Sequence, residues 1–154
     1  MSPLADNQAT SSPAPHAELS KLMSASAQAM NPLSILVVEN HADTSKYLCM
    51  YLQMMGHTVR AAFNLREALK ELAAEPCDVL ISDIGLPDGT GWQLLREAHL
   101  PTSVYAIAMS GFGMGQDASR SKDAGFRHHL LKPFTPDQLD HYLAEAQEER
   151  KNAA

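Results

Sequence analysis

The 154-residue sequence has few cysteines and no long apolar run, and both shortages exclude a class of protein. Its two cysteines, Cys49 and Cys77, lie in apolar surroundings without the spacing of metal ligands, which favours reduced thiols in a cytoplasmic protein. No apolar stretch approaches the length of a membrane span, and the first residues lack the pattern of a signal peptide. We therefore expect no association with a membrane.

The chain is also short of positive charge. Its 12 lysine and arginine residues are outnumbered by 18 acidic residues, which gives a formal net charge of -6. No run of basic residues forms a local patch, so we expect no direct binding to nucleic acid. The content of 45% hydrophobic and 19% charged residues is that of a globular protein with an ordinary core.

The first 32 residues differ in composition from the rest. Prolines are scattered there among Ser, Ala, Asn and Gln, with almost no clustering of aliphatic residues. Such a segment cannot bury enough surface to offset the entropy of ordering, so residues 1–32 are predicted to be a disordered lead-in or linker. The pattern becomes regular at Leu33, which predicts a single domain over residues 33–150 and a short tail over residues 151–154.

Short apolar runs alternate with helical patterns throughout this domain. The runs predict strands at residues 35–38 and 58–62, in the segment that leads into Asp83, and at residues 104–109 and 127–131. Asn64, Thr90 and Thr135 are predicted to be N-caps of the helices that follow them. Five strands alternating with five helices predict an α/β fold with a parallel sheet covered on both faces. Between Asp83 and Thr90, glycine and proline predict a loop without regular structure.

Chemically reactive side chains follow four of these five strands. They are Glu39 and Asn40 after the first strand, Asp83 after the third, Ser110 after the fourth and Lys132 after the fifth. The carboxyl ends of parallel strands meet at one edge of an open sheet, and ligands bind at that edge. Each residue alone has an ordinary explanation, such as a surface lysine or a turn. Their convergence on one edge favours a single shared site.

These residue types together suit phosphoryl chemistry. Glu39 and the amide oxygen of Asn40 beside Asp83 would form an all-oxygen site for Mg²⁺. A carboxylate beside a bound Mg²⁺ can attack phosphorus and form an aspartyl phosphate. Lys132 could then supply a positive charge to one phosphoryl oxygen, and the Ser110 hydroxyl could donate to another.

The sequence resembles the receiver domains of bacterial two-component response regulators and hybrid kinases over residues 33–149. The matching motifs are Ile-Leu-Val-Val-Glu-Asn at 35–40, Ser-Asp-Ile-Gly-Leu-Pro-Asp-Gly-Thr-Gly-Trp at 82–92, Met-Ser-Gly at 109–111 and Leu-Lys-Pro-Phe at 131–134. The resemblance implies a flavodoxin-like three-layer sandwich with strand order 2-1-3-4-5.

The resemblance also implies a role for each site residue. Asp83 would be the phosphoacceptor, and the Gly85 carbonyl would help Glu39, Asn40 and Asp83 to hold Mg²⁺. Ser110 and Lys132 would bind the phosphoryl group, and the bond between Lys132 and Pro133 would be cis. The implied donor is a phosphohistidine on a sensor histidine kinase or phosphotransfer protein. The domain would catalyse its own phosphorylation and dephosphorylation, and would bind a downstream protein through residues 113–150.

The chain departs from the family pattern at two positions. Such domains usually have two adjacent aspartates after the first strand, whereas this chain has Glu39 and Asn40, so charge is lost at the position of a direct metal ligand. We therefore expect weak binding of Mg²⁺. The switch position is commonly Tyr or Phe, whereas here it is His129, whose imidazole can still change orientation and adds sensitivity to pH.

Three alternatives compete with a phosphorylated receiver. The first is a pseudo-receiver, a protein-interaction module that phosphorylation does not control, and the Glu39-Asn40 pair is its only support. The second is a hydrolase of the haloacid-dehalogenase type, which needs an aspartate two residues after the nucleophile, where this chain has Gly85. The third is a metal site at His128 and His141, which would need a third ligand at a suitable spacing.

Overall fold

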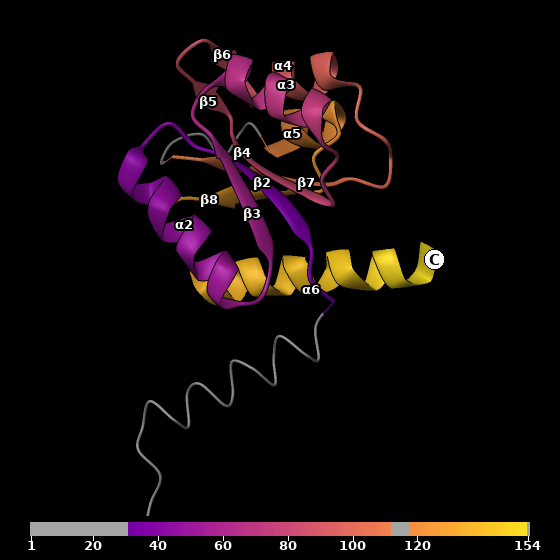
Figure 1. The fold of residues 1–154 in the computed structure, drawn as a ribbon. Helices are drawn as coiled ribbons and strands as arrows, with labels where there is room; N and C mark the ends of the chain where they lie inside the picture. Colours follow the sequence, from indigo (N-terminus) through magenta and orange to yellow (C-terminus); the bar gives the residue numbers. More distant parts are fainter. Residues whose placement is uncertain (1–30, 112–117, 154) are drawn as a thin grey trace, which may run out of the picture.

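Five parallel strands form the central sheet of the computed structural model, which describes residues 31–111 and 118–153 (Figure 1). The strands are β2 (Ser34–Val38), β3 (Thr58–Ala62), β4 (Val79–Asp83), β7 (Tyr105–Ser110) and β8 (His128–Leu131). Their order in the sheet is β3-β2-β4-β7-β8, and each neighbouring pair is parallel. This is the predicted order 2-1-3-4-5. Residues 1–30 of the predicted lead-in lie outside the described residues.

Helices cover both faces of this sheet and form the two outer layers of the sandwich. They are α2 (Ala42–Met54), α3 (Leu65–Ala74), α4 (Gly91–Ala98), α5 (Ala118–Ala124) and α6 (Pro136–Ala153). Figure 1 shows α2 and α6 on one face, and α3, α4 and α5 on the other. The part of the predicted fourth helix over residues 113–117 lies outside the described residues. Within residues 31–111 and 118–153, no helix has the length and apolar character needed to cross a membrane.

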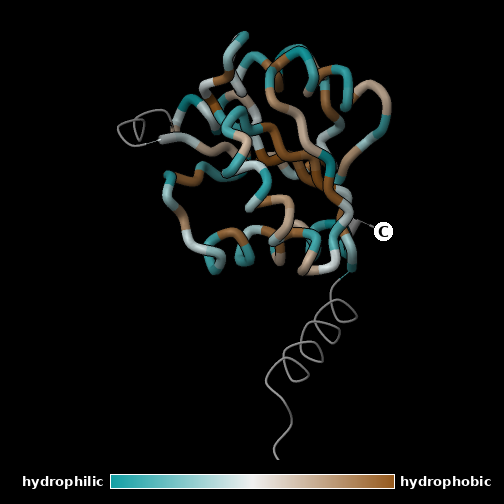
Figure 2. The backbone as a smooth tube through the Cα atoms, turned by 60° about the vertical axis from the view of Figure 1, so that its left-hand side comes forward, coloured by the Kyte–Doolittle hydropathy of each residue, from teal (hydrophilic) through white to brown (hydrophobic). Residues whose placement is uncertain are grey.

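Alternating side chains of the strands divide the core into two layers. In β2, Ile35 and Val37 pack toward α2 and α6, whereas Leu36 and Val38 pack toward α3 and α4. The three inner strands β2, β4 and β7 are apolar on both faces, as expected for a parallel sheet buried between helices. Figure 2 shows these hydrophobic strands at the centre of the domain and hydrophilic segments around them.

Side-chain caps begin three of the helices, as predicted. The side chain of Asn64 accepts a hydrogen bond from the Glu67 backbone N–H (2.7 Å), which begins α3. Thr90 begins α4 in the same way, accepting from Gln93 N at 3.0 Å. At α6 the Thr135 side chain accepts from Gln138 N (3.3 Å), and the Gln138 side chain accepts from Thr135 N (2.9 Å). These caps fix where the helices start after the functional edge of the sheet.

The segment after Asp83 is a small hairpin, so the prediction of a loop without regular structure is wrong. Strands β5 (Gly85–Leu86) and β6 (Gly89–Thr90) pair antiparallel around a two-residue turn. The carboxylate of Asp88 in this turn accepts hydrogen bonds from Leu65 N (2.7 Å) and Arg66 N (3.0 Å) at the start of α3. This contact holds the hairpin in place. Asp88 lies 23 residues after Leu65 and 22 residues after Arg66, so the local sequence around the hairpin does not reveal these partners.

Candidate functional site

The register of the sheet brings the predicted site residues to one edge. Val38 pairs with Ser82, so Glu39 and Asp83 follow at the ends of neighbouring strands. Asp83 in turn pairs with Met109, the residue before Ser110. Ser110 pairs with Leu131, and the backbone N–H of Lys132 donates to the Ser110 carbonyl (2.8 Å). Four chain segments therefore contribute adjacent side chains without any long loop.

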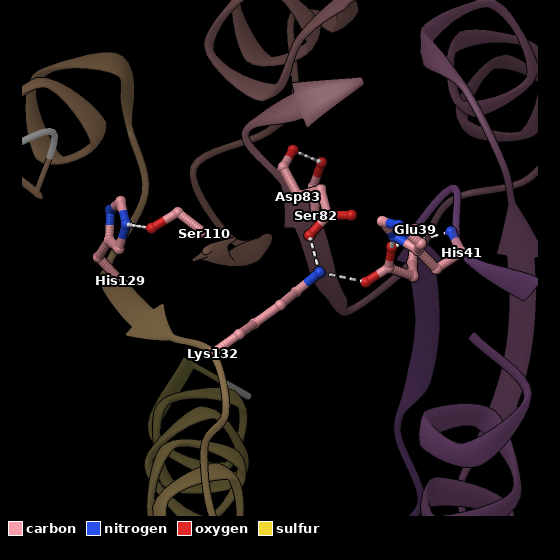
Figure 3. Close-up of polar contacts among 7 residues, drawn as sticks. All are labelled: Glu39, His41, Ser82, Asp83, Ser110, His129 and Lys132. Atoms are coloured by element: carbon pink, nitrogen blue, oxygen red, sulfur yellow. Dashed lines mark hydrogen bonds and ion pairs between the residues drawn. The ribbon is translucent and has the colours of Figure 1, made fainter. Parts of the chain in front are cut away.

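Glu39, Asp83 and Lys132 form a charged cluster. Lys132 extends from the end of β8 and places its ammonium group between the two carboxyl groups (Figure 3). Its Nζ lies 2.6 Å from Asp83 Oδ1 and also donates to Glu39 Oε1. Glu39 is fully buried and Asp83 is 5% exposed, whereas the Lys132 side chain is 25% exposed. The cluster is thus closed toward the core and open toward solvent on the lysine side.

The two buried carboxyl groups have opposite pKa shifts. Burial raises the pKa of Asp83, and a hydrogen bond with Glu39 raises it further, to about 7, although Lys132 partly offsets the change. Burial would also raise the pKa of Glu39, but hydrogen bonds from Asp83, Lys132 and the His41 backbone lower it to about 2. Of the two carboxyl groups, Asp83 therefore has the higher proton affinity.

Lys132 stays positively charged in this environment. Burial alone would lower the pKa of its ammonium group, but hydrogen bonds to Asp83 and Glu39 raise the pKa above its usual value. A fixed cation between two carboxyl groups is suited to stabilise additional negative charge that arrives at Asp83. The adjoining bond between Lys132 and Pro133 is cis, as the resemblance implies.

The backbone of Asp83 is packed closely by the start of α4. A Cβ atom added to Gly91 would lie 2.5 Å from the Asp83 carbonyl oxygen and 3.3 Å from the Ile84 Cα. Because both contacts are with backbone, a side chain at position 91 would push the Asp83 segment out of place. The Gly91 N–H also donates to the Ile84 carbonyl (2.8 Å). Gly91 thus positions the strand end that carries Asp83.

Ser110 belongs to a chain of hydrogen bonds on the other side of the site, which we call the neutral chain because it contains no carboxylate, lysine or arginine. Its hydroxyl is turned toward His129 and away from Asp83 (Figure 3), with 2.5 Å between Ser110 Oγ and His129 Nε2. His129 Nδ1 lies 2.9 Å from Ser121 Oγ on α5, and that oxygen accepts from the indole N–H of Trp92 on α4 (2.9 Å). The neutral chain of Ser110, His129, Ser121 and Trp92 connects the sheet edge to two helices.

The residues expected to hold a metal occupy different environments. Glu39 and Asp83 are adjacent, whereas Asn40 is exposed in the bend after β2 and Gly85 is exposed at the start of β5. Within residues 31–111 and 118–153, no group of three or more His, Cys, Asp or Glu residues could hold a metal.

The remaining donors nevertheless fit Mg²⁺. Two neighbouring carboxyl groups offer oxygen ligands to a hard cation, and Mg²⁺ usually retains several water molecules, so it does not need a complete cage of protein ligands. Lys132 Nζ contacts an oxygen of each carboxyl group, so these two oxygens lie beside the same ammonium group. A metal at this position would have to compete with Lys132 for the same oxygens.

Three residues that sequence reasoning did not assign to the site contact its members. Glu39 Oε2 accepts from the backbone N–H of His41 (3.0 Å) and lies 3.2 Å from its Nδ1. Ser121 and Trp92 extend the neutral chain. The position of His41 two residues after Glu39 was a usable signal, because short polar contacts of this kind recur where helices begin. Nothing in the sequence singles out Ser121.

Comparisons with known proteins agree with this geometry. A family model described as the response regulator receiver domain matches residues 35–144. An uncharacterized 14.6 kDa protein of Leptolyngbya boryana is 32% identical over 115 residues, which cover 73% of this chain and 88% of that protein. The KDP operon transcriptional regulatory protein KdpE of Escherichia coli (strain K12) is 33% identical over 101 residues, which cover 66% of this chain but only 45% of KdpE.

The solved structures include close matches to the fold. A receiver domain protein described as CheY-like, from Methanospirillum hungatei JF-1, superposes with a TM-score of 0.72 at 27% identity. The match covers 79% of this chain and 99% of that protein. The chain thus spans the whole of some relatives and less than half of KdpE.

Proposed function

Because the chain belongs to the family of response regulator receiver domains, we propose that it accepts a phosphoryl group on Asp83 and thereby switches a protein-binding surface. The observation that carries the proposal is the charged cluster, in which Lys132 contacts both Asp83 and the buried Glu39. Receiver domains act in two-component signal transduction, and residues 33–150 would constitute the receiver domain here.

The proposed reaction is an in-line transfer from a phosphohistidine to the Asp83 carboxylate. A bond forms between a carboxylate oxygen of Asp83 and phosphorus, while the bond between phosphorus and the imidazole nitrogen of the donor breaks. Asp83 must lose its proton before it attacks, and a pKa of about 7 leaves a substantial fraction ionised at neutral pH. Lys132 is already beside the oxygen Oδ1 and compensates the charge that the phosphoryl group adds.

Mg²⁺ would be held by Glu39 and Asp83, with oxygens from Asn40, the Gly85 carbonyl and water completing its shell. Bound there, it would neutralise negative charge on the transferred group. Asn40 contributes no charge, which supports the expectation of weak binding. The donor would be a sensor histidine kinase or phosphotransfer protein, and the phosphoryl group would be read by Ser110, Lys132 and His129. Cys49 and Cys77 are free thiols, which is consistent with the cytoplasmic location that we propose.

Incubation with a small acyl phosphate and Mg²⁺ tests the proposal. We expect the intact mass to increase by one labile phosphoryl group, because Asp83 alone lies at a strand end beside the Lys132 ammonium. Asp83→Asn should abolish the increase. Asp123→Asn is a matched control, since Asp123 is exposed on α5 and does not lie at the strand end beside Lys132. A label that persists in the Asp83→Asn variant would rule out the assignment.

The same experiment separates this function from the pseudo-receiver alternative. Asn40 favours that alternative, and so does the engagement of both Glu39 oxygens, one by Lys132 and one by the His41 N–H. A pseudo-receiver would keep its mass unchanged at every Mg²⁺ concentration. A switched receiver would gain the phosphoryl group once Mg²⁺ is high enough to compete with Lys132.

A further inference from the structure

The neutral chain connects Ser110 to residues that lie outside the charged cluster. It begins at Trp92 on α4, passes through Ser121 on α5 and His129 on β8, and ends at Ser110 on β7. Trp92 is 8% exposed and Ser121 is 1% exposed, so the hydrogen bond between them is shielded from water, whereas His129 is half-buried and its two hydrogen bonds in this chain are partly buried. Arg120 on α5 also lies over the Trp92 ring, 3.9 Å from its centroid, and holds the indole against α5.

The indole of Trp92 favours one direction of donation along this chain. An indole N–H can only donate, so Ser121 Oγ accepts from it and can donate its own hydrogen to His129 Nδ1. An imidazole that accepts at Nδ1 carries its proton on Nε2 and donates it to Ser110 Oγ. The opposite tautomer would make Ser121 accept two hydrogen bonds and would require another acceptor for its own buried hydrogen.

We propose that Ser121 and Trp92 are positioning residues that hold His129 against Ser110, and that the neutral chain thereby restrains the Ser110 hydroxyl in its orientation away from Asp83. The proposal rests on the proposed function, in which Ser110 donates to a phosphoryl oxygen. To reach that oxygen, the Ser110 hydroxyl must turn toward Asp83 and give up its hydrogen bond with His129. The neutral chain therefore opposes phosphorylation until the phosphoryl group offers Ser110 a stronger acceptor.

Removing the Ser121 hydroxyl should weaken this restraint. His129 would lose its hydrogen bond with Ser121 at Nδ1, and its hold on Ser110 would weaken by about the net contribution of one hydrogen bond. We expect Ser121→Ala to raise the ratio of phosphorylated to unphosphorylated protein roughly fivefold at a fixed, low concentration of small acyl phosphate with Mg²⁺. Ser121→Thr keeps the hydroxyl and should restore the parent ratio.

A double-mutant cycle distinguishes this restraint from a general loosening of α5. In a Ser110→Ala background there is no hydroxyl to restrain, so adding Ser121→Ala should leave the ratio unchanged. Ser45→Ala is the matched control, because Ser45 is a buried helical serine (2% exposed) on α2, outside the neutral chain. Thermal unfolding of every variant verifies that each is folded.

Two results of the cycle would overturn the proposal. A ratio that falls in Ser121→Ala would mean that Ser121 helps to deliver Ser110 to the phosphoryl group. A rise that persists in the Ser110→Ala background would mean that Ser121 acts through α5 and not through Ser110.

Imidazole ¹⁵N NMR of the unphosphorylated protein tests the neutral chain without any phosphorylation. We expect the proton of neutral His129 on Nε2 in the parent, and a mixture of tautomers in both Ser121→Ala and Trp92→Phe. A proton on Nδ1 in the parent, or an unchanged tautomer in both variants, would overturn the positioning role. If no variant is phosphorylated on Asp83, the proposed function fails, while this measurement still decides whether the chain orients His129.

Discussion

The charged cluster, which contains Asp83, and the neutral chain, which ends at Ser110, differ in what holds their side chains in place. Glu39, Asp83 and Lys132 directly follow or end strands of one sheet, so the backbone ladder fixes their spacing. Ser110 and His129 also lie on strands, but their partners Ser121 and Trp92 come from α5 and α4. The charged cluster is therefore part of the rigid sheet, whereas the neutral chain changes whenever these helices move.

Under the proposed function, this difference would place phosphoryl transfer on one side of the site and its readout on the other. Charge placed by a rigid sheet is preorganised for phosphoryl transfer and needs no rearrangement when the reaction occurs. A neutral chain of single hydrogen bonds, each contributing about 1 kcal/mol, is weak enough for a new acceptor to break it. A phosphoryl group would thus leave the charged cluster largely in place and alter the contacts of α5 and α4.

The largest effect should come from removing the cation of the charged cluster. We expect Lys132→Met to slow phosphorylation by the small acyl phosphate about a hundredfold, the usual effect of deleting one preorganised charge or donor. The same change should tighten Mg²⁺ binding, because Lys132 no longer competes for the oxygens of Asp83 and Glu39. Phosphorylation rates at saturating Mg²⁺ and Mg²⁺ titrations would measure the two effects separately.

Lys70→Met is the matched control for this experiment. Lys70 is exposed on α3, away from the sheet edge, so its replacement should change neither quantity. If Lys132→Met were phosphorylated at the parent rate, the charged cluster would not be responsible for phosphoryl transfer. The proposed difference in role between the charged cluster and the neutral chain would then be wrong.

A smaller effect is expected when charge is added beside the charged cluster. Asn40 is exposed after β2, and its side chain could offer Mg²⁺ only a neutral oxygen. Asn40→Asp adds a carboxylate, which should tighten Mg²⁺ binding about tenfold, equivalent to 1.4 kcal/mol. Phosphorylation should then reach half of its maximum rate at a lower Mg²⁺ concentration. Unchanged Mg²⁺ affinity in this variant would mean that charge at position 40 does not limit binding.

The charged cluster was predictable from the sequence and the neutral chain was not. Strand ends can be read from apolar runs, and a parallel sheet necessarily gathers them at one edge, which places Glu39, Asp83 and Lys132 together. Ser121 lies in a short helix without a clear apolar face, and its partners depend on how α4 and α5 pack. The hairpin after Asp83 was missed for the same reason, because Asp88 holds it against α3 through a hydrogen bond from Leu65, which is distant in sequence.

The smallest expected effect is the change in structure that phosphorylation causes outside the site. It directly tests whether the neutral chain, and not the charged cluster, transmits the effect of phosphorylation. If the neutral chain carries the readout, backbone NMR shifts should change on phosphorylation in β8, α5 and α6, within the predicted output surface of residues 113–150. The changes should also reach Trp92 at the start of α4, because its indole ends the chain. Helices α2 and α3 should change little beyond the residues next to Asp83, since the ladder holds that side of the sheet. The Asp83→Asn protein treated with the same donor provides the baseline and should show none of these changes. Shifts confined to α2 and α3 would place the output on the opposite side of the domain and contradict the assignment of readout to the neutral chain.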